Sequence, residues 1–164
     1  MITKETKMLL FRYSNYKKLK FIKEHESIIT NDKYAWMMKM GKRTSISKIE
    51  AIMQSGGYMV LKSPVAEGNL FYLARFVDFS EELPEDEAHM PKYYSEIIED
   101  DAFWEAPTQF FKIVDLIPLK QEYVESLVLD KNKRKVVEVV NETRTAVMFI
   151  ENTIDFDVSL MQGE

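Results

Sequence analysis

Hydrophobic residues in the first third of the chain change their period several times, and each change marks an expected element. Residues 7–13 form an apolar run without helix breakers, which predicts a strand, and Ser14 or Asn15 can cap a helix after it. From residue 16 to about 27, apolar side chains recur every three or four positions with lysines between them. This spacing predicts an amphipathic helix with a basic outer face. Residues 30–33, with the sequence Thr-Asn-Asp-Lys, are expected to form a turn.

The next segments alternate between strand and helix periods. Residues 34–42 place large apolar side chains on both faces of an expected strand. Residues 45–57 return to a helical period, in which Ser47 and Glu50 match a capping box. Two strands are then expected at residues 58–62 and 70–77, and the turn-rich segment between them favours an antiparallel pair.

Residues 78–106 carry eleven acidic side chains and a single lysine, together with two prolines. This composition predicts a long exposed loop without regular structure, and long loops inside compact domains tend to carry function. Beyond it, residues 110–116 and 143–150 are expected to be strands and residues 122–129 a short helix. Residues 136–140 fit either a strand or a short helix.

The pattern as a whole predicts a mixed α+β domain around a largely antiparallel sheet of about six strands, with two to three helices. The 164 residues are 46% hydrophobic and 30% charged, with few glycines and prolines, which excludes collagen-like and disordered classes. We expect residues 1–150 to form this single domain and residues 151–164 to fray. Since no apolar stretch approaches 18 residues and the start lacks a signal-peptide pattern, we expect a cytoplasmic protein without a membrane partner.

The residue content gives little material for catalysis. The chain has no cysteine, and its two histidines, His25 and His89, are far apart in unlike surroundings. The acidic residues follow no EF-hand spacing, and exposed carboxylates make poor acids near neutral pH. A nuclease site of Lys112, Asp115 and Glu138 matches no known motif. We therefore expect a non-catalytic protein without a metal or a cofactor.

Charge is divided unevenly along the chain. Residues 1–62 carry a net charge of +8 and residues 63–164 a net charge of −13, so the chain is −5 overall. Lys42 and Arg43 come after an expected strand and precede a helix start, where cations and free backbone N–H groups can hold one phosphate. The run from Lys131 to Lys135 can also contact a phosphate backbone, although a solvated hairpin turn is the simpler interpretation.

Three local patterns occur in order along residues 34–119. First, an early strand carries an aromatic pair and then a lysine. Second, a paired strand precedes the acidic segment. Third, the chain has a proline with aromatics, a later tryptophan and a strand that ends in Pro-Leu. The residues are Tyr34, Trp36 and Lys39; residues 71–77; Pro91, Tyr93, Tyr94 and Trp104; and Pro118 with Leu119. This order resembles the EVE domain of the PUA-like superfamily, which includes YTH and ASCH domains. The N-terminal strand and the basic helix precede the usual opening strand of that family.

The resemblance implies a PUA-like fold, with a sheet or partly open barrel, and an aromatic pocket that holds a plain or modified base of DNA or RNA. The implied binding residues are Tyr34, Trp36, Lys39, Lys42, Arg43, Tyr93, Tyr94 and Trp104. Stacking on such rings is worth about 1 to 3 kcal/mol per base. Two alternatives stay open: the tryptophans are core anchors, or the acidic segment 78–106 binds a basic protein partner.

Overall fold

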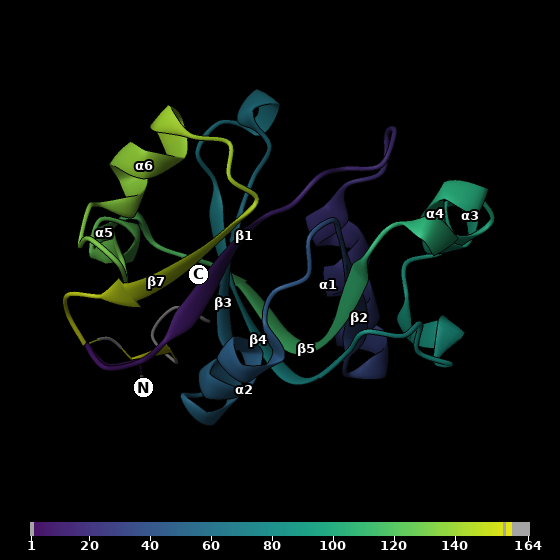
Figure 1. Ribbon diagram of the computed structural model, residues 1–164, viewed down its shortest axis with the longest axis horizontal. Coiled ribbons are helices and arrows are strands. Elements are labelled where there is room, and N and C mark those ends of the chain that lie inside the picture. Colours follow the sequence, from purple (N-terminus) through teal and green to yellow (C-terminus); the bar gives the residue numbers. More distant parts are fainter. Residues whose placement is uncertain (1, 156, 159–164) are drawn as a thin grey trace.

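The computed structural model describes residues 2–155, 157 and 158, and Figure 1 shows their arrangement. The strands are β1 (Met8–Arg12), β2 (Ala35–Met40), β3 (Tyr58–Lys62), β4 (Phe71–Ser80), β5 (Thr108–Pro118), β6 (Leu127–Leu129) and β7 (Val147–Asn152). The α-helices are α1 (Phe21–Asp32), α2 (Ile46–Gln54), α3 (Tyr94–Ile98), α4 (Asp101–Glu105), α5 (Gln121–Val124) and α6 (Val136–Glu142). Short 3₁₀ turns lie at Val65–Glu67 and Glu87–His89.

The seven strands form one sheet in the order β2-β5-β4-β3-β1-β7-β6. Strands β1 and β3 run parallel, and every other neighbouring pair in this order is antiparallel. The expected mixed α+β class and the largely antiparallel sheet, including the β3–β4 pair, are confirmed. The described residues contain seven strands and six α-helices, which is more than expected, and the sheet is not closed into a barrel.

The sheet separates two layers of helices, because alternate residues of its central strands face opposite sides. Leu9 and Leu61 pack in one apolar cluster with residues of α1 and α2. Leu10 and Val60, their chain neighbours, pack in a second cluster with residues of α5 and α6. Helices α3 and α4 lie beyond one end of the sheet, near β2 and β5 (Figure 1). The core is therefore divided by the sheet into two main parts.

The first helix differs from its prediction at both ends. Residues 16 to 19 close a tight turn through a pair of Tyr16–Leu19 backbone hydrogen bonds, so α1 begins only at Phe21. The N-cap of α1 is therefore Lys20 and not Ser14 or Asn15 as expected, although Asn15 Oδ1 accepts the Phe21 N–H at 2.8 Å. The expected turn at residues 30–33 is wrong: α1 continues to Asp32 and ends at Lys33, which has a φ of 77°.

Three further predictions need correction. The capping box in α2 is absent, because Ser45 is the N-cap and makes no side-chain capping hydrogen bond. The expected helix at residues 122–129 divides into α5 and β6, which pairs with β7. Residues 136–140 adopt the helical alternative and form most of α6, whose buried valines face the sheet. Valine-rich segments are ambiguous by content alone, since burial suits either element.

The segment 78–106 is not an irregular loop. Strand β4 extends to Ser80, and the segment contains α3, α4 and one 3₁₀ turn. Its buried apolar residues are Met90, Pro91, Tyr93, Tyr94 and Phe103. Apolar side chains between its acidic residues pack inward. The prediction of an irregular loop considered the number of charges and not their spacing.

The end of the domain lies beyond residue 150, because β7 continues to Asn152. The Thr153 N–H donates to Ser126 O, and Asp155 Oδ1 accepts the Lys4 N–H. The rest of the segment expected to fray includes residues 156 and 159–164, which lie outside the described residues. In the part of the chain that is described, no helix has the length and apolar character needed to cross a bilayer.

Candidate functional site

The aromatic residues predicted to form a base pocket come together, but inside the protein. Trp36, Tyr93 and Tyr94 pack in one cluster with side chains of β2, β5 and α4. Trp36 and Tyr93 are each 6% exposed and Tyr94 is 3% exposed. These rings are therefore largely covered by their neighbours and do not form an open aromatic cage. Tyr94 instead lines a hollow of about 500 Å³ together with Leu83, Met90 and Pro91.

The polar atoms of this cluster have partners within the protein. Asp86 Oδ2 accepts the Trp36 indole N–H at 3.1 Å and the Tyr34 hydroxyl at 3.0 Å. These two hydrogen bonds, that of Trp36 first, lower the pKa of Asp86. The Tyr34 ring stacks on His89, with 3.8 Å between ring centroids. Trp36 is thus a core anchor with its N–H satisfied, one of the alternatives that the sequence left open.

A buried chain of hydrogen bonds covers the outer edge of β2. The Met38 N–H donates to the Tyr94 hydroxyl at 3.0 Å, and this hydroxyl lies 2.7 Å from His25 Nε2. His25 Nδ1 lies 2.7 Å from Phe21 O. Both rings are buried, and desolvation lowers the pKa of His25 to about 4 and raises that of Tyr94. Tyr94 therefore supplies a partner to one backbone N–H of the edge strand β2, that of Met38.

Trp104 takes no part in the chain of hydrogen bonds that Tyr94 and His25 form. It is 65% exposed on α4, and its indole N–H donates to Ile98 O at 3.1 Å. Its ring meets Phe103 edge to face at 4.9 Å between centroids. The structure therefore separates Trp104 from the other predicted aromatics and leaves it on the surface.

The predicted basic residues lie at the end of β2 and in the loop that follows it. Lys39 is 2% exposed, and its ammonium donates to Lys42 O. Burial lowers the pKa of Lys39, because desolvation disfavours the charged form. Lys42 and Arg43 are exposed in the connection from β2 to α2. A buried lysine is thus hydrogen-bonded to the loop that carries an exposed pair of cations.

The connection from β2 to α2 is fixed to β5 by several hydrogen bonds. Gln109 clamps Thr44 from both sides: its Oε1 accepts the Thr44 N–H at 2.8 Å and its Nε2 donates to Thr44 O at 2.7 Å. Arg43 Nε donates to Thr108 O at 3.0 Å, and the Gly41 N–H donates to Pro107 O at 3.0 Å. The loop therefore presents its lysines from a fixed backbone.

A hollow of about 510 Å³ opens where this loop meets the start of α2 and the start of β7. We call it the lysine hollow. Strands β2 and β7 are not neighbours in the sheet, yet residues of both line the hollow. Register shifts interrupt the β4–β5 pair next to Phe76, and irregularities of this kind increase the local bend and twist of a strand. The lining residues are Lys39–Ser45, Lys48, Thr145–Val147 and Phe149.

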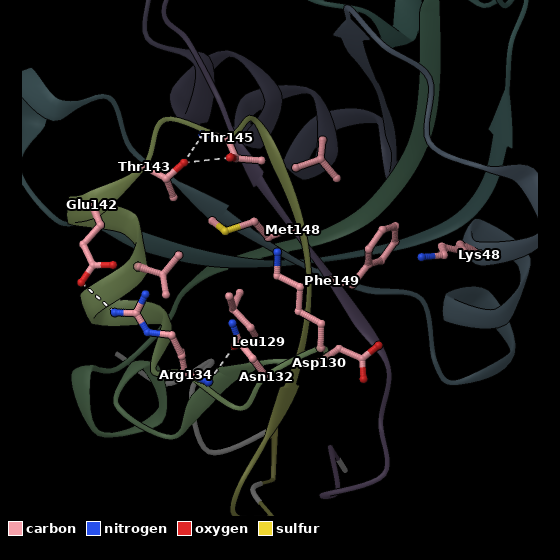
Figure 2. A pocket seen from close by; sticks show the side chains of 13 residues that line it. Lys48, Leu129, Asp130, Asn132, Arg134, Glu142, Thr143, Thr145, Met148 and Phe149 are labelled. Atoms are coloured by element: carbon pink, nitrogen blue, oxygen red, sulfur yellow. Dashed lines mark hydrogen bonds and ion pairs between the residues drawn. The ribbon is translucent and has the colours of Figure 1, made fainter.

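A second hollow of about 480 Å³ adjoins the first, and Figure 2 shows its lining. Lys48, Thr145, Val147 and Phe149 line both hollows, while Lys131 and Arg134 line only the second. Figure 2 shows Lys48 beside the Phe149 ring and Arg134 across the hollow near Glu142. The Lys48 ammonium lies 4.1 Å from the centroid of the half-buried Phe149 ring. The two basic segments of the sequence thus meet across β7.

We call the exposed cations of these two hollows the basic face: Lys42, Arg43, Lys48, Lys131 and Arg134. Two of them have acidic partners, Arg43 with Glu81 at 3.7 Å and Arg134 with Glu142 at 2.7 Å. The second pair raises the pKa of Arg134 and lowers that of Glu142. Both pairs are at the surface and contribute little to stability. Among the described residues, no group of three or more His, Asp or Glu side chains is arranged to hold a metal ion.

Sequence reasoning found Lys39, Lys42 and Arg43 but missed Lys48 and Phe149. In the sequence, Lys48 is a lysine within a predicted helix and Phe149 an aromatic residue within a predicted strand, and neither belongs to a motif. Only their meeting across two elements gives them a common surface. Comparison with known proteins adds no assignment, since the chain matches no protein-family model, no curated protein and no solved structure.

Proposed function

We propose that this chain is a non-catalytic module that binds a nucleic-acid strand along the basic face. One observation carries the proposal: two basic segments that lie almost ninety residues apart in the sequence line adjoining hollows on either side of β7. Cations spaced along a surface match the regular spacing of phosphates, and release of counterions drives such binding. The resemblance to EVE and PUA-like domains points to the same class of ligand.

The composition of the face favours a single strand over a duplex. Phe149 is half-buried at the centre of the face, between the two sets of cations, and offers one ring for a base. The Lys48 ammonium lies over one face of that ring, so a base stacks there when Lys48 moves from the ring to a phosphate. A cationic groove with an aromatic platform is the usual composition of sites that bind single strands with little sequence preference. The net charge of −5 opposes unspecific binding elsewhere on the molecule.

The first test is fluorescence anisotropy of labelled single-stranded DNA and RNA at about 50 and 200 mM salt. For about four phosphate contacts, the affinity is expected to fall with a slope near −3 in log K against log salt. The double variant Lys131→Ala/Arg134→Ala removes two cations of the face and is expected to weaken binding roughly tenfold and to reduce the salt slope by about 1 to 2.

The matched control is Lys18→Ala/Lys23→Ala, which removes two exposed lysines that line neither hollow of the basic face. It changes the net charge by the same amount and is expected to leave the affinity within about twofold. Equal losses in both double variants would show that attraction depends on overall charge alone. Such a result, or the absence of binding to either nucleic acid, contradicts the proposed function.

A second candidate function is favoured by the exposure of Trp104. The ring is held by its hydrogen bond to Ile98 O and is surrounded in sequence by four exposed carboxylates: Glu99, Asp100, Asp101 and Glu105. Exposed tryptophans are enriched among residues that dominate protein interfaces, and the carboxylates suit a basic partner. This arrangement keeps the expected basic protein partner as an alternative and moves its centre to α3 and α4.

A fluorescently labelled lysine- and arginine-rich peptide is the probe for this second function, with fluorescence anisotropy of the peptide as the measurement. If the surface binds it, Trp104→Ala is expected to weaken binding about tenfold, because the change removes the central apolar contact. The control is Val65→Ala, which shortens another exposed apolar side chain, 73% exposed in a different part of the structure. Binding that ignores Trp104→Ala and disappears with added salt would be charge attraction only, and would contradict this candidate.

A further inference from the structure

Three lysines line the lysine hollow without an acidic partner. Lys39 is 2% exposed, while Lys42 and Lys48 are exposed at the rim. Among the described residues, no carboxylate lies within 4 Å of any of the three ammonium groups. Lys39 uses one of its three N–H donors on Lys42 O. Buried charges in proteins are normally paired with an opposite charge, so a buried lysine in the wall of a hollow, with two N–H donors left over, suits the binding of an anion.

The start of α2 adds to the positive character of the same hollow. Ser45, its N-cap, lines the hollow and makes no side-chain capping hydrogen bond. The N–H groups of Lys48 and Ile49 both donate to Ser45 O, whereas no partner is found within the described residues for those of Ile46 and Ser47. Unsatisfied N–H groups at a helix start carry a partial positive charge that favours anions. The Gln109 clamp on Thr44 keeps this start fixed relative to Lys39.

We propose that the lysine hollow binds the doubly charged phosphate of a monoester, at the end of the nucleic-acid strand that lies along the basic face. Three uncompensated lysines and a helix start exceed the single charge of a diester, whereas a monoester carries about −1.5 to −2 near neutral pH. The hollow lies at one end of the basic face, with Lys48 and Phe149 leading from it to the second hollow. The monoester then marks the strand terminus and the second hollow takes the adjoining nucleotides.

This inference rests on the proposed function for the identity of the strand, but the anion site can be tested without any nucleic acid. Inorganic phosphate is titrated into the full chain while backbone amide NMR signals are followed, with chloride at equal ionic strength as the reference. Saturable shifts are expected at Gly41, Lys42 and the residues that begin α2. Shifts that do not saturate, or that chloride reproduces, overturn the site.

The decisive variant is Lys39→Met, which removes the buried charge and keeps a long apolar stem. The variant removes the desolvation cost of a buried charge and leaves no opposite charge without its partner, so the fold is expected to persist. The matched control is Lys62→Met: Lys62 is 1% exposed, its ammonium donates to Ser63 O and Gly68 O, and it does not line this hollow. Phosphate affinity is expected to fall about tenfold or more in the first variant and to stay unchanged in the second.

The rim variant Lys42→Ala gives an independent measurement, since an exposed lysine can be removed without risk to folding. A several-fold loss of phosphate affinity is expected there, and unchanged affinity in both Lys39→Met and Lys42→Ala overturns the assignment.

A comparison of 5′-phosphorylated, 3′-phosphorylated and unphosphorylated oligonucleotides distinguishes this inference from the proposed function. One phosphorylated end is expected to bind about tenfold tighter, and Lys39→Met is expected to abolish that preference. Binding without any end preference overturns the terminal monoester and leaves the proposed function standing. Phosphate binding without binding of any oligonucleotide means instead that the monoester belongs to a small molecule, which overturns the proposed function and leaves the anion site.

Discussion

Replacing Gly57 with alanine is expected to lower the free energy of unfolding by about 4 kcal/mol, because two separate costs combine at this position. The φ of Gly57 is +75°, a conformation that other residues rarely adopt. A Cβ atom at this position would also lie 2.2 Å from the backbone oxygen of Phe76. That strand cannot move away freely, since the Phe76 N–H donates to Gly57 O at 2.8 Å.

The control for this effect is Gly68→Ala, which shares the backbone strain but not the clash. Gly68 has a φ of +86°, and a Cβ there meets no atom within 4 Å. Its expected cost is about 1 to 3 kcal/mol, from the conformation alone. Both values are measured by equilibrium unfolding in denaturant. Equal losses at the two positions would show that Phe76 shifts at no cost, which contradicts the tight junction between α2, β3 and β4.

Stability is expected to fall by roughly 3 kcal/mol as the pH decreases from about 6.5 to about 4, through the protonation of His25. Burial lowers the pKa of His25 from 6.5 to about 4 in the folded chain. Between these values the unfolded chain binds the proton and the folded chain does not, so acid favours unfolding. The effect is complete near the lower value and absent above the upper one. Unfolding midpoints in urea across this pH range give the measurement.

His25→Gln is the control that isolates this contribution. Glutamine does not titrate, so the variant is expected to lose most of the pH dependence in this window, whatever its stability at neutral pH. Asp86 and Glu67 have lowered pKa values, and their protonation also costs stability at lower pH, in both proteins alike. The difference between the two pH profiles therefore belongs to His25. Parallel profiles would show that water reaches His25 in the folded protein.

Local sequence patterns placed most elements and failed mainly at their ends. Apolar runs bounded by turn residues located β1, β3 and β4 closely, whereas Asn15, expected as a helix cap, lies five residues before the N-cap of α1, Lys20. The start of α1 was wrong because the turn at residues 16–19 keeps the apolar spacing of a helix. The interior of segment 78–106 was missed, since its charges were counted without its spacing. The spacing of apolar residues indicates which face of a segment is buried. It does not indicate where the backbone leaves a helix to form a turn.

The candidate site was predictable only in pieces. Lys42 and Arg43 were expected to contact phosphate because they stand between a strand and a helix start, and they do line a hollow. Trp36 and Tyr94 were expected to surround a base, yet both are buried in hydrogen-bonded positions. An aromatic side chain in a half-buried strand has the same pattern in either role, so burial alone separates a pocket wall from a core residue.

The sequence by itself determined the α+β class, the antiparallel β3–β4 pair and the local cations after β2, because each depends on the order of neighbouring residues. Only the tertiary structure decided which distant segments share a surface. The fold places the loop after β2 and the start of β7 around one hollow, brings Lys48 of α2 against Phe149 of β7, and sets Lys131 on the neighbouring hollow. The physical reason is that contacts between distant segments are selected by packing of the whole core, which no short pattern encodes.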